Sequence, residues 1–108
     1  MDDRELLELA AKAAGIKHPG GEHCINGPAV WDCEALRWWR PLTDDGDALR
    51  LAVKLMLSVT IGPCEVQAVS ISGALRGELP KEDAIYQDMG IATRRAIVRA
   101  AAEIGRAM

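Results

Sequence analysis

The chain contains no phenylalanine and a single tyrosine, and aromatic residues make up only 4% of its 108 positions. Its core must therefore be built from leucine, isoleucine, valine, alanine and methionine. A chain of this length holds one such core, which predicts a single domain spanning residues 1–108. No apolar run approaches membrane-spanning length, and Met1–Glu5 lacks the basic start and apolar run of a signal peptide. We therefore expect a cytosolic protein without a membrane partner.

Disulfides and a strong charge of either sign are also lacking. The three cysteines, Cys24, Cys33 and Cys64, are odd in number and irregularly spaced, which indicates reduced thiols. A net charge of −3 and a pI near 5.3 make a nucleic-acid partner unlikely, because backbone binding needs many cations. The exception is the basic C-terminal stretch from Arg94, which leaves local anion binding open.

A first helix is predicted from Asp2, which with Glu5 resembles an acidic capping box, to Gly15, a natural stop. After it the helical periodicity ends. His-Pro-Gly-Gly and Asn-Gly-Pro sequences and scattered tryptophans follow, and we predict a variable loop over about 17–41 with one short strand. The small size of the core also favours a homo-oligomer.

The second helix follows Pro41, with Thr43 or Asp44 as its cap, and the third runs from a cap near Asp88 to the C-terminus. Between them the alternation predicts a hairpin of strands 57–61 and 65–71, with a bulge between Ala68 and Val69. Residues 72–80 are turn-like, or extend the sheet at 74–76. The predicted class is α+β, with three helices on a small antiparallel sheet in the order α-loop-α-β-β-α. Helices two and three are expected to pack on one face of that sheet.

Helical projection assigns faces to these helices. The second is expected to bury one broad apolar face and to leave Asp47, Arg50 and Lys54 on the opposite side. That apolar face comprises Ala48, Leu49, Ala52, Val53, Leu55 and Met56. The last helix is expected to bury Ile97, Ala100, Ala101, Ile104 and Met108, and to point Arg95, Arg99 and Arg106 away from the core.

Arg94 lies at the edge of this last apolar stripe, where a permanent charge needs a partner. One interpretation is a salt bridge to Asp44, Asp45 or Asp47. The other is a contact with a ligand phosphate, because the guanidinium fork suits that geometry.

No motif in the chain is specific for catalysis or for metal binding. His18, His23, Cys24 and Cys33 could supply zinc ligands, but their spacing fits no zinc pattern. The acidic run 44–47 leads directly into an apolar helix, which is typical of helix capping and unlike a calcium loop. The sequence therefore predicts no metal site, no cofactor and no enzyme.

The run Trp38-Trp39-Arg40 is the strongest local indication of binding. In an extended segment consecutive side chains alternate, so one indole at most enters the core easily. The other is available for packing beneath a loop, for stacking on a base or for docking a partner.

Two segments, WRPLTDDGDALRLAVKL from Trp39 to Leu55 and ATRRAIVRAAAEIG from Ala92 to Gly105, resemble a family of small phage and prophage proteins of proteobacteria. With the helix at Asp3–Ile16 they cover about half of the chain in the same order. The layout is more distantly similar to NinX-type phage accessory proteins. Residues 17–37 match nothing in this family, and the resemblance implies no catalytic residues.

The resemblance implies a phage accessory protein in the cytoplasm of the infected bacterial host. By analogy with such proteins, we expect it to counter host defence by stoichiometric binding. The expected partner is an anionic small molecule such as an immune nucleotide, bound by Trp38, Trp39, Arg50, Lys54, Arg94 and Arg95. The alternatives are a protein-directed, anti-CRISPR-like inhibitor of a host defence complex and a nucleotide-processing enzyme that uses a metal at Asp44, Asp45 and Asp47.

Overall fold

The computed structural model describes residues 2–16, 25–61, 66–69, 76–78 and 89–108. This part of the chain holds three helices, α1 (Asp3–Ala14), α2 (Asp45–Lys54) and α4 (Met89–Ala107). One antiparallel sheet consists of β1 (Ile25–Asn26), β2 (Ala29–Asp32) and β3 (Arg37–Trp39). A second consists of β4 (Ser58–Ile61), β5 (Val66–Val69) and β6 (Arg76–Glu78). The predicted α+β class is confirmed.

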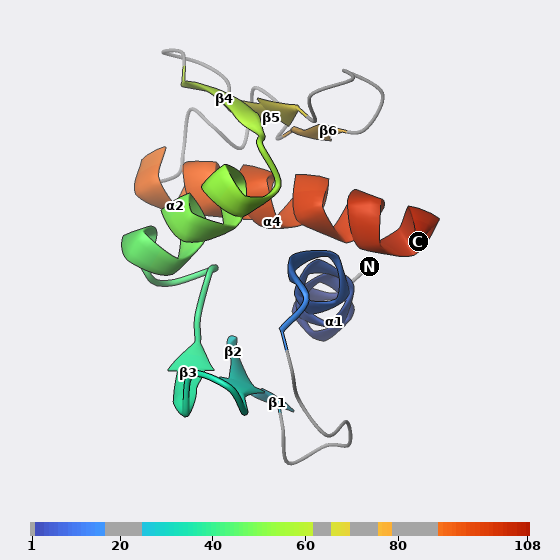
Figure 1. Ribbon diagram of the computed structural model, residues 1–108. Coiled ribbons are helices and arrows are strands. Elements are labelled where there is room, and N and C mark those ends of the chain that lie inside the picture. Colours follow the sequence, from blue (N-terminus) through green and yellow to red (C-terminus); the bar gives the residue numbers. More distant parts are fainter. Residues whose placement is uncertain (1, 17–24, 62–65, 70–75, 79–88) are drawn as a thin grey trace.

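Helix α4 is the centre of the arrangement. It crosses the middle of Figure 1, with the β4–β6 sheet on one side and α1 on the other, and α2 packs alongside it. The β1–β3 sheet lies beyond α1, on the side away from α4. The protein is therefore layered as sheet, α4 with α2 beside it, α1, sheet.

Both predicted ends of α1 and the predicted start of α2 are confirmed. The side chain of Asp2 accepts a hydrogen bond from the backbone N–H of Glu5 at 2.8 Å, and Gly15 ends α1 in the left-handed conformation at φ 72°. At α2 the cap is Asp44, whose carboxylate accepts from the N–H of Asp47 at 2.8 Å. The cap predicted near Asp88 lies outside the described residues.

Where the sequence suggested a loop, residues 25–39 form the three short strands of the first sheet. A turn at Gly27, with φ 60°, joins β1 to β2. A second turn joins β2 to β3, and the Asp32 carboxylate accepts there from the N–H groups of Glu34 and Ala35. Strands of two to four residues are too short to show a clear period of two. Because these strands are so short, the sequence of residues 25–39 resembles that of a loop.

The hairpin predicted for residues 57–61 and 65–71 is confirmed as β4 and β5, and β6 adds a third strand to it. Its register runs without interruption from Ser58 opposite Val69 to Ile61 opposite Val66, so the bulge predicted at Ala68 and Val69 is wrong. The sheet packs on α4, which contacts all three of its strands. Helix α2 packs mainly on α4, so the two helices do not lie side by side on the sheet as expected.

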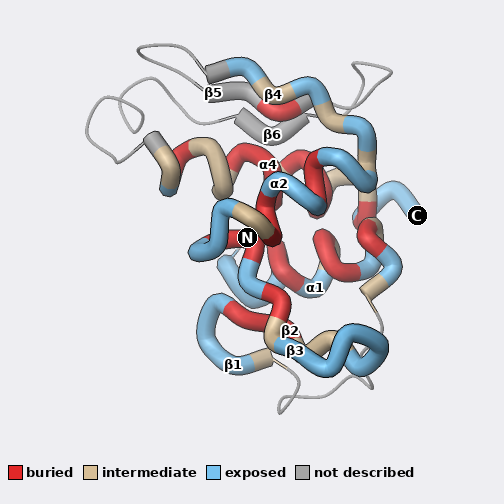
Figure 2. The backbone as a smooth tube through the Cα atoms, turned by 60° about the vertical axis from the view of Figure 1, so that its left-hand side comes forward, coloured by how far each residue is buried: buried red, intermediate tan, exposed pale blue. Residues whose placement is uncertain are grey.

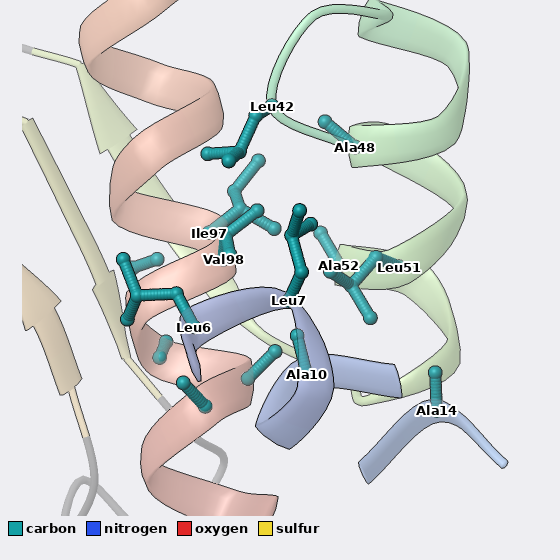
Figure 3. Packing of buried hydrophobic residues seen from close by; sticks show 14 of the residues in the cluster. Leu6, Leu7, Ala10, Ala14, Leu42, Ala48, Leu51, Ala52, Ile97 and Val98 are labelled. Atoms are coloured by element: carbon teal, nitrogen blue, oxygen red, sulfur yellow. The ribbon is translucent and has the colours of Figure 1, made fainter. Parts of the chain in front are cut away.

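Small side chains dominate the core. Alanines of α1 and α4 are fully buried where the two helices meet, and Figure 2 shows the buried stretches of both helices. Leu7 of α1 points into the space between α2 and α4, next to Ala52 and Val98 (Figure 3). Because alanine hardly extends beyond the backbone, the helices approach closely.

The buried surface of α4 is wider than the predicted stripe. Ile97, Ala100 and Ala101 are buried as expected, whereas Ile104 is half-buried and Met108 is exposed. Further buried positions lie around the helix: Ala92, Ala96, Val98, Ala102 and Gly105. A helix covered by a sheet and by two helices needs more than one apolar face, which a single projection angle does not capture.

The closest approach of α1 and α4 is at Gly105. A Cβ atom at this position would lie 2.0 Å from the backbone oxygen of Leu9. We expect Gly105→Ala to lower the free energy of unfolding by about 1–3 kcal/mol, because the helices must separate. In an uncrowded helix the same change stabilises by about 1 kcal/mol.

Urea unfolding of Gly105→Ala and of the control Gly46→Ala tests this expectation. A Cβ at Gly46 would lie 3.1–3.3 Å from the side-chain ends of Arg50 and Asp44, which can shift more easily than backbone, so the control should lose less stability than Gly105→Ala. An unchanged or higher stability of Gly105→Ala would contradict the close contact.

Candidate functional site

A buried carboxylate, that of Asp47, joins the first turn of α2 to β3; its side chain is 1% exposed. The guanidinium of Arg37 donates to both carboxylate oxygens, from Nη1 at 2.9 Å and from Nη2 at 3.0 Å. The backbone N–H of Arg40 donates at 2.9 Å, and Nη2 of Arg50 donates at 2.7 Å. A charge can be buried when such donors replace its water, so these three groups explain why Asp47 lies in the interior.

This burial corrects the predicted faces of α2. Arg50 and Lys54 are exposed as expected, but Asp47 belongs to the buried face. Three apolar side chains expected in the core are exposed: Leu49, Val53 and Met56. Arg37 and Arg40 cover only the Asp47 end of the polar side of α2, which hydrophobic periodicity alone does not reveal.

The same contacts set the pKa of Asp47. Burial alone would raise the pKa of this carboxyl, but the hydrogen bonds from Arg37, Arg50 and the Arg40 N–H outweigh it and lower the pKa below its ordinary value. In return, the hydrogen bond and charge of Asp47 raise the pKa of Arg37. Asp47 is therefore ionised at neutral pH, and it binds the proton less tightly in the folded than in the unfolded chain.

Strand β3 presents different side chains to its two faces. Trp39 is buried in the core, whereas Trp38 is half-buried on the opposite face. Trp38 pairs across the sheet with Trp31, and the two rings meet edge to face with centroids 5.4 Å apart and planes at 70°. The prediction that one of the consecutive indoles enters the core is confirmed.

On the face that carries Trp38 lies a pocket of about 360 Å³, which we call the outer pocket. Its lining is Asn26, Gly27, Pro28, Ala29, Trp38, Arg40 and Thr43. It combines an aromatic ring, an amide, a hydroxyl and a guanidinium. Within the described ranges the Arg40 guanidinium has no ion-pair partner, since only the backbone N–H of Arg40 contacts Asp47.

On the other face of β3, Arg37, Arg50 and Lys54 line a second pocket of about 150 Å³, which we call the inner pocket. Its remaining lining is Ala14, Ile16, Asp32, Trp39, Asp47 and Leu51. The inner pocket thus brings together three of the residues predicted to bind a ligand: Trp39, Arg50 and Lys54. Trp38 lies in the outer pocket, so the predicted set does not form one site.

The two remaining predicted residues lie elsewhere. Arg94 donates from Nε to the backbone oxygen of Leu42 at 2.9 Å and forms a salt bridge with Asp45. The intramolecular partner expected for Arg94 is thereby confirmed. Arg94 also lines an open, largely apolar groove of about 460 Å³ between α2, β4 and α4. Arg95 forms a salt bridge with Asp3 of α1 at 3.0 Å.

The carboxylates that a metal-dependent enzyme would need do not converge. Asp44 caps α2, Asp45 binds Arg94, and Asp47 binds arginines of β3 and α2. No cluster of three His, Cys, Asp or Glu side chains in the described part of the chain is placed to hold a metal ion. Cys33 is an exposed thiol, and His18, His23 and Cys24 lie outside the described residues. In the same described part, no helix is long and apolar enough to cross a membrane.

Several pocket residues were missed at the level of sequence. Asn26 and Thr43 were assigned only to turns and caps, and Arg37 was assigned no role. The sequence does indicate that Arg40 shares a site with Trp38, because it lies two residues after Trp38 and therefore on the same face of an extended strand. The role of Arg37 depends on the burial of Asp47 ten residues later, which no local pattern encodes.

We expect Asp47→Asn to lower the free energy of unfolding by about 2–3 kcal/mol at pH 7, because two guanidinium groups lose their anion. The carboxylate's contribution to the free energy of unfolding is complete above its unfolded pKa of about 4 and is lost as the pH falls through the lower folded pKa. The difference in free energy of unfolding between the parent protein and Asp47→Asn should therefore become smaller below about pH 4.

Urea unfolding of both proteins between pH 3 and 7, followed by tryptophan fluorescence, measures this difference. Glu103→Gln, which removes one partner of a solvent-exposed pair with Arg106, is the control and should change stability by less than about 0.5 kcal/mol. A difference for Asp47→Asn that stays constant over this pH range would contradict the lowered pKa.

Comparison of the chain with protein-family models, with curated proteins and with solved structures gives no match.

Proposed function

We propose that this protein acts by stoichiometric binding of a small anionic ligand with an aromatic ring, such as a nucleotide, in the outer pocket. The observation that carries the proposal is that one pocket on an exposed sheet face holds both the Trp38 ring and the Arg40 guanidinium, which has no ion-pair partner among the described residues. A nucleotide carries both features that these groups recognise, a π-face and a phosphate.

The chemistry of the lining supports this ligand class. Stacking of a base on an aromatic side chain contributes about 1–3 kcal/mol, and a guanidinium can bind a phosphate through two parallel hydrogen bonds. The Asn26 amide and the Thr43 hydroxyl supply donors and acceptors for a base edge or a ribose. The volume of about 360 Å³ falls within the range of small-molecule sites, roughly 300–1,000 Å³.

The lining also favours binding over turnover. Among the described residues that line the outer pocket there is no carboxylate, imidazole or thiol to act as acid, base or nucleophile. A protein that removes a signal by occupancy needs no such group.

The biological setting of the proposal comes from the resemblance to phage accessory proteins. One of the two similar segments, Trp39–Leu55, holds the end of β3 and all of α2, and so includes Arg40 and Thr43 of the outer pocket. We propose that the protein sequesters a nucleotide signal of host defence in the cytoplasm of the infected bacterium.

Calorimetric titration with ADP-ribose, a cyclic dinucleotide and a cyclic trinucleotide tests the ligand class. We expect at least one of them to bind with one-to-one stoichiometry per site. Trp38→Ala should weaken that binding by about tenfold or more, and Trp38→Phe should restore part of it because a ring remains. Arg40→Ala should weaken it similarly, while keeping the backbone N–H that Asp47 needs.

Arg4→Ala is the matched control, since Arg4 lies exposed on α1 and pairs only with Glu8 of its own helix in the described structure. Thermal unfolding of each variant separates lost binding from lost folding. The absence of binding by all three ligands, or equal affinities of the parent and Trp38→Ala, would contradict the proposal.

The groove between α2, β4 and α4 favours a second candidate function, a protein-directed inhibitor. The groove is largely apolar, and Leu49 at its edge is exposed. An amphipathic helix of a host defence protein fits such a surface, because its apolar stripe can lie in the groove. Leu49→Asp should then abolish capture of that protein from host lysate, whereas Leu36→Asp, on the β2–β3 turn, should not.

A further inference from the structure

The inner pocket gathers three cationic side chains from two elements. Arg37 comes from β3, and Arg50 and Lys54 come from one side of α2. The same lining contains two carboxylates, Asp32 and Asp47. The lining thus holds three positive and two negative charges, and a third carboxylate, that of Asp44, lies 3.8 Å from Nη2 of Arg50.

Asp47 holds the two arginines in place but uses only some of their N–H donors. A guanidinium carries five N–H donors, and Asp47 receives two from Arg37 and one from Arg50. The side chain of Arg37 is 47% exposed and that of Arg50 is 65% exposed, although Asp47 beneath them is covered. Arg37 is therefore held along one edge by Asp47, and Arg50 is held by Asp47 and, at 3.8 Å, by Asp44, while each guanidinium keeps further N–H donors. Such ordering reduces the entropy lost when a ligand binds.

Lys54 adds a third cation to the inner pocket. It makes no ion pair with any residue in the described ranges. Its Nζ lies near Gly15 at the end of α1, 3.9 Å from where a Cβ of that glycine would be. The ammonium group is thus close to the α1 side of the inner pocket, while the two arginines approach from the side of Asp47.

We infer that the inner pocket binds a small oxyanion, a phosphate or carboxylate group, through Arg37, Arg50 and Lys54. Its volume of about 150 Å³ admits one such group and is well below the usual size of a nucleotide site. Asp47 is a positioning residue of this site, because it acts through the two arginines. The inference does not rest on the proposed function, since the outer pocket lies on the opposite face of β3.

Titration of the ¹⁵N-labelled protein with inorganic phosphate, followed by amide chemical shifts at constant ionic strength, tests the site. We expect saturable shifts at Arg37, Arg50 and Lys54 with a millimolar dissociation constant. Lys54→Ala should raise that constant about tenfold, because one of three charge-assisted contacts is lost. This variant should fold normally, because Lys54 forms no ion pair within the described part of the chain. Equal shifts with sodium chloride alone, or an unchanged constant in Lys54→Ala, would overturn the inference.

Two comparisons complete the experiment. Lys12→Ala removes an exposed cation of α1 outside the inner pocket and should leave phosphate binding unchanged, as should Trp38→Ala in the outer pocket. Loss of binding in both would mean that the shifts report general charge or folding, and would overturn the site. A parallel titration with acetate identifies the source, because tighter binding of phosphate assigns a phosphate-bearing ligand and tighter binding of acetate assigns a carboxylate.

Discussion

The carboxylate of Asp47 is the constraint on which the arrangement around β3 depends. It is covered by protein, and its charge is tolerated only because donors from Arg37, Arg40 and Arg50 converge on it. Arg37 belongs to β3, Arg40 follows it directly and Arg50 belongs to α2, so the carboxylate fixes the strand against the helix. Once β3 is fixed, its alternation places Trp38 and Arg40 on one face and Arg37 and Trp39 on the other. Both pockets therefore depend on one buried charge.

The rest of the core is held together by close packing of small apolar side chains and not by a buried charge. The interior is built largely of alanine, leucine and valine, and the α1–α4 contact is so close that Gly105 has no room for a Cβ atom. Small residues give each helix little apolar area but allow many short contacts between backbones. Rigidity at this contact comes from close packing, whereas at β3 it comes from hydrogen bonds to a charge.

Much of the fold could be predicted from the sequence, because its signals are local. The caps at Asp2 and Asp44, the stop at Gly15, and the second hairpin each depend on residues within a few positions of one another. The burial of Asp47 could not be predicted in this way, since it depends on a strand that packs on the polar side of α2. For the same reason the residues predicted to bind one ligand lie in separate places, because whether two cations share a pocket depends on tertiary structure. The intramolecular partner of Arg94 was predictable because an arginine at the edge of an apolar stripe needs an acid, and α2 begins with several.

The central position of α4 has a consequence for how the chain reaches its folded state. The most extensive contact between described elements joins α1, near the start of the chain, to α4, at residues 89–107. Leu7 and Ala10 cannot be covered until Met89–Ala107 has been synthesised. Contacts between segments so far apart in sequence slow folding, because a long loop must close before any free energy is gained. On the ribosome, the face of α1 that packs on α4 therefore stays uncovered until α4 has been synthesised.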